Sequence, residues 1–255
     1  MYQESADLIL GMLRPQDVVL DIGGWARPFN RANYVIDQEP YETRGHYELP
    51  AQGGEREFFT RETWIQRDIC AREPYPFGPK EIDFVICSHT LEDVRDPLWV
   101  CSEAARIAKA GYLEVPSRIA ESSRGVEPGQ VGWSHHRWLI EIEGSHLSFL
   151  MKYHKIHSHW RLSLPERFLR RLADERQRQW LFWNGSFTFS EVTLHGPDTI
   201  QAELEKFVQA VHPYPRWLLA ADRVYRSTLS LARRARAKAG RSARSLGESA
   251  SRKKS

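Results

Sequence analysis

Residues 18–24 carry the pattern that most constrains this fold: an apolar run that meets an acid and ends in two glycines. Apolar residues without polar alternation indicate a strand covered on both faces, as in the parallel sheets of α/β proteins. Gly23 and Gly24 permit a tight turn and the close approach of a ligand to the backbone. Asp21 places a carboxylate near the carboxyl end of the strand, where open α/β sheets bind ligands. A purely structural turn is the alternative interpretation.

Four more segments have the apolar character of strands, and they lie at 33–37, 63–70, 82–87 and 112–116. Asp37 closes the second strand, where a carboxylate can accept two hydrogen bonds from a ribose diol. An N-cap or turn role accounts for Asp37 equally well. Only eight residues, 25–32, separate the first two strands, which is too short for an ordinary crossover helix. We therefore expect a loop there.

Two segments show helical spacing of apolar residues, a short one at 6–13 and a longer one at 98–108. Gly111 follows the longer segment, where a glycine commonly ends a helix. Strands alternating with helical segments predict an α/β fold with a Rossmann-like, doubly wound and mostly parallel sheet.

The composition suits a globular domain. The chain has 255 residues, of which 41% are hydrophobic and 27% charged. Cys70, Cys87 and Cys101 form no CxxC pair, so we expect buried thiols in a reducing compartment. Residues 1–7 carry acids and no basic leader region, and no apolar run reaches membrane-spanning length. We accordingly expect a cytoplasmic protein.

Charge is distributed unevenly along the chain. Residues 216–255 contain twelve Lys or Arg and two acids, a net charge of +10, so the rest of the chain carries −7 within a total of +3. Apolar residues at helical spacing over 216–238 could dock on the acidic body, an acidic protein or an anionic membrane surface. Aromatic residues do not interleave with the basic ones beyond residue 225, so nucleic-acid binding is not favoured. The sequence does not indicate an oligomeric state.

The series of motifs resembles the class I S-adenosylmethionine-dependent methyltransferases, in particular the broad bacterial type 11-like group. That group shows a strand with D-x-G, then D-x-x-x-x-P-F, then F-D-x-V-x-x-x-x-x-L-E-H-x-x-D-P, and finally a strand followed by proline. The resemblance covers about residues 15–118 and is most specific at 82–97.

This resemblance implies S-adenosyl-L-methionine as the cofactor. Carboxylates accept hydrogen bonds from hydroxyls and amines, and backbone amides after a strand can bind a carboxylate. Eight residues would line the cofactor pocket: Asp21, Gly23 and Gly24 beside the methionine part, Asp37 at the ribose, Asp68 and Ile69 at the adenine, and Ser88 and His89 after the fourth strand.

The chain departs from the group's pattern at two places. The third glycine of the first motif is replaced by the stretch 25–28, and Asp93 stands where the histidine after Leu-Glu is usual. We expect an active methyltransferase that transfers a methyl group to a small-molecule or glycan acceptor, more readily through oxygen than carbon. The alternative is a catalytically degenerate protein of the same fold that acts as an interaction or membrane-surface module.

Beyond residue 116 the acceptor side is expected at 132–138, which contains His135 and His136 between two tryptophans. Imidazole titrates near neutrality and can act as a general base or position a substrate, while tryptophan offers an aromatic wall. The alternative is that one histidine is packed and the tryptophans are cross-strand partners. Sequence does not separate the two histidines. Residues 117–132 are expected to form a mobile loop or lid.

The remaining segments complete the predicted architecture. We expect hairpins at 139–150 and 180–189 that add antiparallel strands to the sheet, with turns at Gly144 and at Asn184-Gly185. Helices are expected over 162–180 and 202–211. Three histidines between residues 154 and 159 match no zinc pattern, so no metal site is predicted.

The domain organisation follows from these segments. We predict a methyltransferase-like domain over 1–200 with an inserted lid and hairpin at about 117–160. A helical extension over 201–239 and a disordered basic tail over 240–255 complete the chain.

Overall fold

A computed structural model describes residues 1–222, 224, 225, 227 and 228, which belong to two compact units, Met1–Val208 and Gln209–Ser255. Most of the basic segment 216–238 and the whole tail 240–255 lie outside the described residues, although residues 216–222 are helical. None of the helices in the described part combines the length and apolar character that a bilayer crossing requires.

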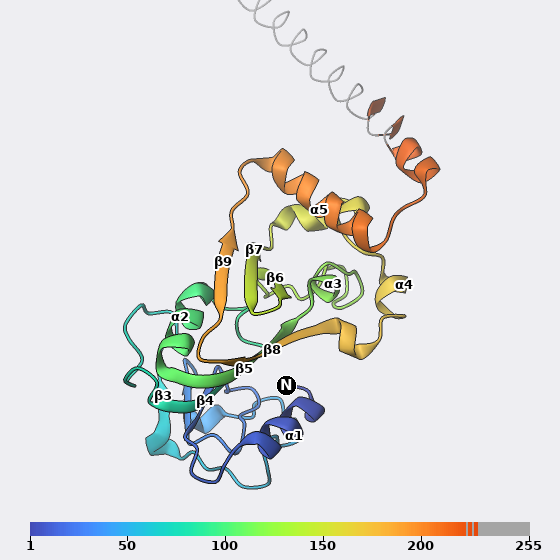
Figure 1. The fold of residues 1–255 in the computed structure, drawn as a ribbon. Helices are drawn as coiled ribbons and strands as arrows, with labels where there is room; N and C mark the ends of the chain where they lie inside the picture. The colour runs from blue at the N-terminus through green and yellow to red at the C-terminus, as the bar shows by residue number, and fades with distance from the viewer. Residues whose placement is uncertain (223, 226, 229–255) are drawn as a thin grey trace, which may run out of the picture. The chain divides into compact units, whose positions relative to one another are not determined.

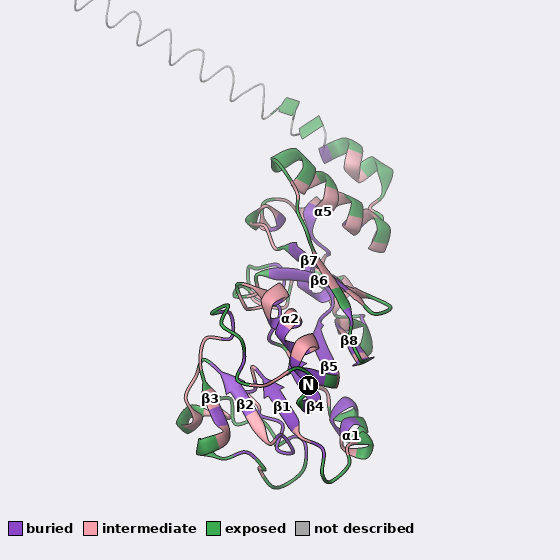
Figure 2. Ribbon diagram, turned by 60° about the vertical axis from the view of Figure 1, so that its left-hand side comes forward, coloured by how far each residue is buried: buried purple, intermediate pink, exposed green. Residues whose placement is uncertain are grey.

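The first unit is built around a six-stranded sheet in the order β3-β2-β1-β4-β5-β8. Its strands β3, β4, β5 and β8 are labelled in Figure 1, and all six are labelled in Figure 2. All neighbours in this sheet are parallel except β8, which is antiparallel to β5. This order confirms the predicted Rossmann-like, mostly parallel α/β fold with a late antiparallel strand. The strands are β1 (Val19–Ile22), β2 (Tyr34–Asp37), β3 (Trp64–Gln66), β4 (Ile82–Ser88), β5 (Ala108–Pro116) and β8 (Arg178–Asn184).

Side chains alternate between the two faces of this sheet, and both faces are covered. On one face Leu20, Val85 and Leu113 belong to a core that α2 (Pro97–Ile107) helps to close. On the other face Val19 and Phe84 pack with α1 (Gln3–Met12). Figure 2 shows β1 buried along its whole length, and β4 and β5 are buried over most of theirs. This double burial is why the strand at residues 18–22 lacks polar alternation.

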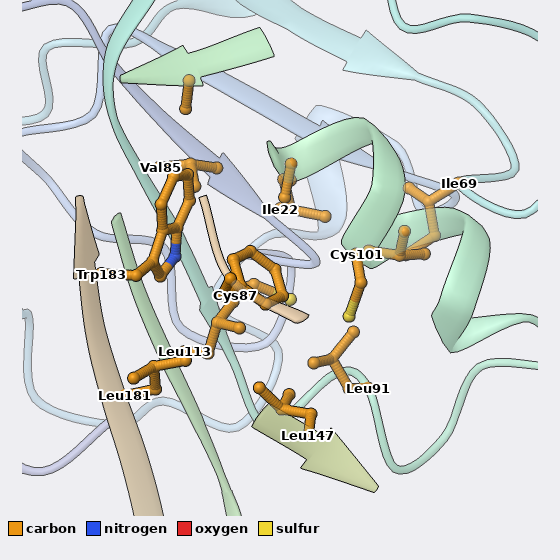
Figure 3. Close-up of a cluster of buried hydrophobic side chains, with 14 of the residues drawn as sticks. Ile22, Ile69, Val85, Cys87, Leu91, Cys101, Leu113, Leu147, Leu181 and Trp183 are labelled. Carbon is orange, nitrogen blue, oxygen red and sulfur yellow. The ribbon is translucent and has the colours of Figure 1, made fainter. Parts of the chain in front are cut away.

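The first of these cores contains side chains from most elements of the unit. Figure 3 shows Ile22, Val85, Leu113, Leu181 and Trp183 gathered with residues from α2 and a second sheet. The three thiols, Cys70, Cys87 and Cys101, are free and buried, as predicted.

A second, three-stranded sheet has the order β6-β7-β9, with β6 (Trp138–Glu143), β7 (His146–Met151) and β9 (Thr188–Val192). The hairpin predicted at 139–150 is confirmed as β6 and β7, which turn at Gly144 with a φ of 60°. The hairpins were expected to extend the main sheet, and for β6 and β7 this is wrong. They form a separate layer whose Ile140 and Leu147 pack into the first core.

The hairpin predicted at 180–189 is also wrong, because its two strands lie in different sheets. The Gly185 amide donates to the Lys109 carbonyl (2.7 Å) and ends β8 beside β5. The Thr188 amide then donates to the Ser145 carbonyl (3.0 Å), which brings β9 alongside β7 in parallel. The Asn-Gly pair therefore moves the chain from one sheet to the other.

Helix α2 begins where predicted and ends before the glycine that was expected to stop it. The Asp96 side chain caps it by accepting from the Trp99 amide (3.1 Å), and Pro97 occupies the first turn, where proline is favourable. The helix ends at Ile107, and β5 starts at the next residue. The glycine stop predicted at Gly111 is wrong: Gly111 is a strand residue opposite Val85 and Trp183.

Two other segments differ from their predictions. Residues 117–132 begin with a short helix, α3 (Arg118–Glu121), and residues 117–118 and 120–123 are buried rather than exposed in a loop. The helix expected over 162–180 is reduced to α4 (Glu166–Leu169) and a 3-10 turn, η5 (Asp174–Gln177). Neither short element buries any residue, and the buried leucines of the stretch, Leu162, Leu164 and Leu172, lie outside both, so neither element has a buried apolar face that would stabilise a longer helix.

The remaining elements are short apart from one helix. α5 (Pro197–Val211) contains the helix expected over 202–211, and its Leu204 packs into a small core with Leu139 and Leu150. The 3-10 turns are η1 (Tyr41–Thr43), η2 (Arg61–Thr63), η3 (His154–His157) and η4 (Trp160–Leu162).

Gly111 provides a test of the packing between β4, β5 and β8. A Cβ at this position would lie 2.6 Å from Val85 Cγ1 and 2.7 Å from the Val85 carbonyl oxygen, so we expect Gly111→Ala to lower the free energy of unfolding by about 1–3 kcal/mol. Gly11→Ala is the matched control. Nothing lies within 4 Å of its Cβ, and alanine favours the helix by about 0.5–1 kcal/mol. Urea denaturation measures both, and equal stability of the Gly111→Ala variant and the parent protein would contradict the packing described.

Candidate functional site

A cavity of about 870 Å³ opens at the carboxyl ends of the parallel strands. Its walls come from the segments that follow β1, β2, β3, β4 and β5 and from the stretch before β6. All ten residues proposed from sequence line this one cavity: Asp21, Gly23, Gly24, Asp37, Asp68, Ile69, Ser88, His89, His135 and His136.

The turn after β1 requires both glycines. Gly23 has a φ of 76°, and a Cβ there would lie 2.2 Å from Thr90 Oγ1. A Cβ on Gly24 would lie 2.4 Å from Asp21 Oδ2. Asp21 is buried and accepts a hydrogen bond from the Phe29 amide (2.8 Å). Burial raises the pKa of Asp21 to about 7 despite that hydrogen bond.

Asp37, at the end of β2, holds the same loop from its other end. Its Oδ2 accepts from the Trp25 amide (3.0 Å) and its Oδ1 from the Glu39 amide (2.9 Å). Burial raises the pKa of Asp37, and the two amides oppose that shift. The Trp25 indole stacks on His46 with ring centroids 5.2 Å apart. The abbreviated crossover at 25–32 is a loop, as expected, and it is fixed between two carboxylates.

Asp68 follows β3 and is held in its charged form. Partial burial would raise its pKa, but a hydrogen bond from the Cys70 amide (2.8 Å) and the Arg95 guanidinium, 2.6 Å from Oδ2, lower it overall. Ile69 beside it is buried and presents an apolar surface to the cavity.

His89 occupies a strained position after β4 between two buried acids. Its φ is 53°, and its Nε2 lies 3.0 Å from Glu114 Oε1 while its Nδ1 lies 3.4 Å from Glu92 Oε1. Burial opposes protonation, but these carboxylates raise the pKa of His89 to about 9. Glu114 is completely buried, which would raise its pKa, yet His89 and other donors lower it to about 2. Ser88 Oγ also points to Glu114 (3.4 Å).

The two histidines of the stretch before β6 differ in the structure. The His136 side chain is 7% exposed, stacks on Trp133 at 5.0 Å between centroids, and has Nδ1 2.5 Å from Glu121 Oε1. The His135 side chain is 62% exposed. Lys152 Nζ lies 2.7 Å from Glu121 Oε2 and completes a buried polar group behind His136. Only His136 is therefore held in one orientation by hydrogen bonding and stacking.

Sequence reasoning did not identify Glu92, Glu114 or Glu121 as residues around the site. Each is at most 1% exposed. Glu114 had a usable signal, because it is a lone acid within the apolar strand 112–116. Glu121 had none, because it was assigned to a mobile loop.

The chemistry available in the cavity differs between its two ends. Carboxylates at the ends of β2 and β3 can accept hydrogen bonds from hydroxyls and amines. The other end carries imidazoles, an indole and Asp93. A cavity of this size and mixed lining can hold a cofactor and a small second molecule.

No family model matches the chain, and no curated protein matches its sequence. A solved S-adenosylmethionine-dependent methyltransferase from Thermotoga maritima is similar over 54% of this chain and 64% of its own, with 20% identity and a TM-score of 0.35. A Bacillus halodurans protein provisionally assigned as a methyltransferase is similar over 45% of this chain and 51% of its own, with 20% identity and a TM-score of 0.33. A Haloferax volcanii complex of the Trm112 methyltransferase activator with a provisionally assigned methyltransferase is similar over 44% of this chain and 51% of the matched chain, with 19% identity and a TM-score of 0.32.

The matched part of the chain spans about half the length of the Bacillus and Haloferax proteins. The assignment of the fold accordingly rests on the strand order of the central sheet. The finer resemblance to the type 11-like group gains no support from family models.

The pair His89 and Glu114 gives the stability of the protein a definite pH dependence. The raised pKa of His89 stabilises the folded state below the unfolded value of 6.5, and this contribution is lost as pH rises through about 9. The lowered pKa of Glu114 contributes above 4.5 and is lost as pH falls through about 2. Asparagine tolerates the positive φ of this position. We therefore expect the His89→Asn change to lower the free energy of unfolding most near pH 6 and least near pH 10.

Urea unfolding across this pH range measures the difference. His154→Asn, which changes an exposed histidine of η3, is the control. A destabilisation of His89→Asn that stays constant from pH 6 to pH 10 would show that the imidazole charge does not contribute.

Proposed function

We propose that this protein transfers a methyl group from S-adenosyl-L-methionine to an oxygen of a small-molecule or glycan acceptor. One observation carries the proposal: acids at the ends of β1 and β2 and after β3, the turn after β4 and the histidine pair all line a single cavity. The residues that the family resemblance pairs with the cofactor are scattered over 69 positions of sequence, from Asp21 to His89, yet they meet at one edge of the sheet.

The Asp37 carboxylate has lone pairs left that could accept hydrogen bonds from a ribose. Each of its oxygens accepts one backbone amide, from Trp25 and from Glu39. A carboxylate oxygen has two lone pairs, so each can accept one more hydrogen bond from a ribose hydroxyl. Asp68 and Ile69 would contact the adenine beyond it, and the turn at Gly23 and Gly24 would lie beside the methionine part.

The acceptor would lie at the end of the cavity that carries His135 and His136. In such a transfer, an oxygen lone pair of the acceptor would form the bond to the methyl carbon, and the electron pair of the carbon–sulfur bond would stay on sulfur. The hydroxyl proton would leave for the histidine end or for solvent. The attacking oxygen must be aligned behind the methyl group, so positioning supplies much of the rate. The acidic lining also suits a cationic sulfonium.

One observation favours a second function, that of a non-catalytic interaction module. Asp21 and Asp37 both accept amides of the loop 25–32, which is a structural use of the first motif. A protein that kept these carboxylates only to fix the loop would be a non-catalytic interaction module of the same fold. Cofactor binding separates the two functions.

Isothermal titration with S-adenosylhomocysteine and S-adenosylmethionine tests the cofactor site. We expect binding by the parent protein and a loss of about 10- to 100-fold in affinity for Asp37→Ala, because two charge-assisted hydrogen bonds to the ribose are removed. Glu143→Ala, an exposed acid at the end of β6, is the matched control and should bind normally. Absence of binding to the folded parent protein would favour the interaction module.

The histidine end is tested by turnover. We expect His136→Asn to reduce the release of S-adenosylhomocysteine, with any hydroxyl compound that serves as acceptor, by about 10²- to 10⁴-fold. Its affinity for S-adenosylhomocysteine should change less than about threefold, because His136 lies at the acceptor end. Unchanged turnover in both His135→Gln and His136→Asn would remove the histidine pair from the reaction.

A further inference from the structure

Three potential metal ligands converge at the histidine end of the cavity. His136 Nε2 lies 3.6 Å from Asp93 Oδ1, and His135 Nε2 lies 3.9 Å from the same oxygen. One ligand atom from each of the three residues falls within 4.8 Å of the others. These separations are too long for hydrogen bonds. The 3.6 and 3.9 Å separations suit atoms that share a cation, each at about 2.0–2.2 Å from it.

Carboxylate oxygens without a hydrogen-bond partner lie at the same place. Asp93 Oδ1 is a buried atom that accepts no hydrogen bond, and Glu92 is 1% exposed with neither oxygen hydrogen-bonded. The ion-pair contact of Glu92 is with His89, and across residues 1–222 neither Glu92 nor Asp93 pairs with a Lys or Arg. A dication bound there would give the buried Asp93 oxygen the partner that it lacks and would add positive charge beside Glu92.

The residues around His136 are arranged as they are around metal-bound histidines. Glu121 Oε1 lies 2.5 Å from His136 Nδ1, so Nδ1 can donate to it, and in that tautomer the Nε2 lone pair is left free for a metal on the side of Asp93. Lys152 holds the other oxygen of Glu121, and Trp133 stacks on the ring. A carboxylate on the far nitrogen of a metal-bound histidine is the usual outer-shell arrangement.

We propose that Asp93, His135 and His136 bind a divalent transition-metal ion, with Glu121 as the outer-shell partner of His136. Two imidazoles and one carboxylate favour ions such as Zn²⁺, Mn²⁺ or Co²⁺ over Mg²⁺ and Ca²⁺. Three protein ligands leave coordination positions open to the cavity. The site was not expected from sequence, where the only metal hypothesis concerned residues 154–159.

The metal gives the histidine end a specific role that rests on the proposed methyl transfer. An acceptor hydroxyl on an open position would be more acidic and would lose its proton to solvent. Its oxygen would then form the bond to the methyl carbon while the carbon–sulfur pair returns to sulfur. The substrate class is accordingly a hydroxyl compound, such as a vicinal diol, that can coordinate a metal.

Titration of the chelator-treated, full-length protein with Co²⁺ tests the site without any acceptor. We expect one equivalent of Co²⁺ to produce the visible absorbance of a low-coordinate nitrogen–oxygen site, and Zn²⁺ to displace it. Asp93→Asn and His135→Gln should each weaken Co²⁺ binding at least tenfold. Both side chains are partly exposed, at 40% and 62%, so neither change removes core packing. Glu121→Gln should weaken binding by about 10- to 100-fold.

His154→Gln is the matched control, because it removes a histidine from the His-rich turn η3 and should leave Co²⁺ binding unchanged. Equal Co²⁺ affinity in the parent protein, Asp93→Asn and His135→Gln would overturn the proposal, as would the absence of binding to the parent. S-adenosylhomocysteine affinity, measured on the same samples, reports the cofactor site separately. Metal binding without cofactor binding would leave the metal site standing while the methyltransferase proposal fails.

Discussion

The organisation of the site depends on two buried carboxylates that hold one short loop. Asp21 accepts the Phe29 amide and Asp37 accepts the Trp25 amide, so the strands β1 and β2 are connected without a crossover helix. A loop with free backbone amides needs such acceptors, because buried unpaired N–H groups are costly. The acids at the strand ends thus have two roles: they fix the loop that forms part of the cavity wall, and they line the cavity themselves. Gly23 and Gly24 follow from the same constraint, since Asp21 and Thr90 fill the space where their side chains would be.

The parallel core could be predicted from sequence because its signals are local. Strands covered on both faces are continuous apolar runs, and the order of those runs set the topology of β1 to β5. The antiparallel region could not be predicted as well. Residues 180–189 have hairpin turn chemistry, but partner choice depends on strands 40 or more residues away, as the pairings of Leu147 with Phe189 and Gly111 with Trp183 show. The helix expected over 162–180 does not form, because the buried leucines Leu162, Leu164 and Leu172 lie outside the short elements α4 and η5 and give neither of them a buried apolar face.

In the candidate site, too, local features could be predicted from sequence and long-range contacts could not. The ten residues proposed from sequence meet in one cavity because each lies at a strand end or, for His135 and His136, just before β6. The partners that set their electrostatics lie elsewhere in the chain: Glu114 within β5, Glu121 in α3 and Lys152 after β7. Which histidine is held, and by what, depends on these long-range contacts. No pattern around residue 135 contains that information.

The crossing from β8 to β9 has a consequence for assembly of the chain during synthesis. The strand-end acids are all available once residue 89 has been made, and β1, β2 and β4 can pair from that point. The layer beside the histidine pair is different, because β7 gains its second neighbour only when residues 188–192 arrive, and β8 must first be placed against β5. Contacts between residues so distant in sequence form slowly. The part of the cavity lined by the strand-end acids can therefore take shape early, and the part beside the histidine pair only after β9 has been made.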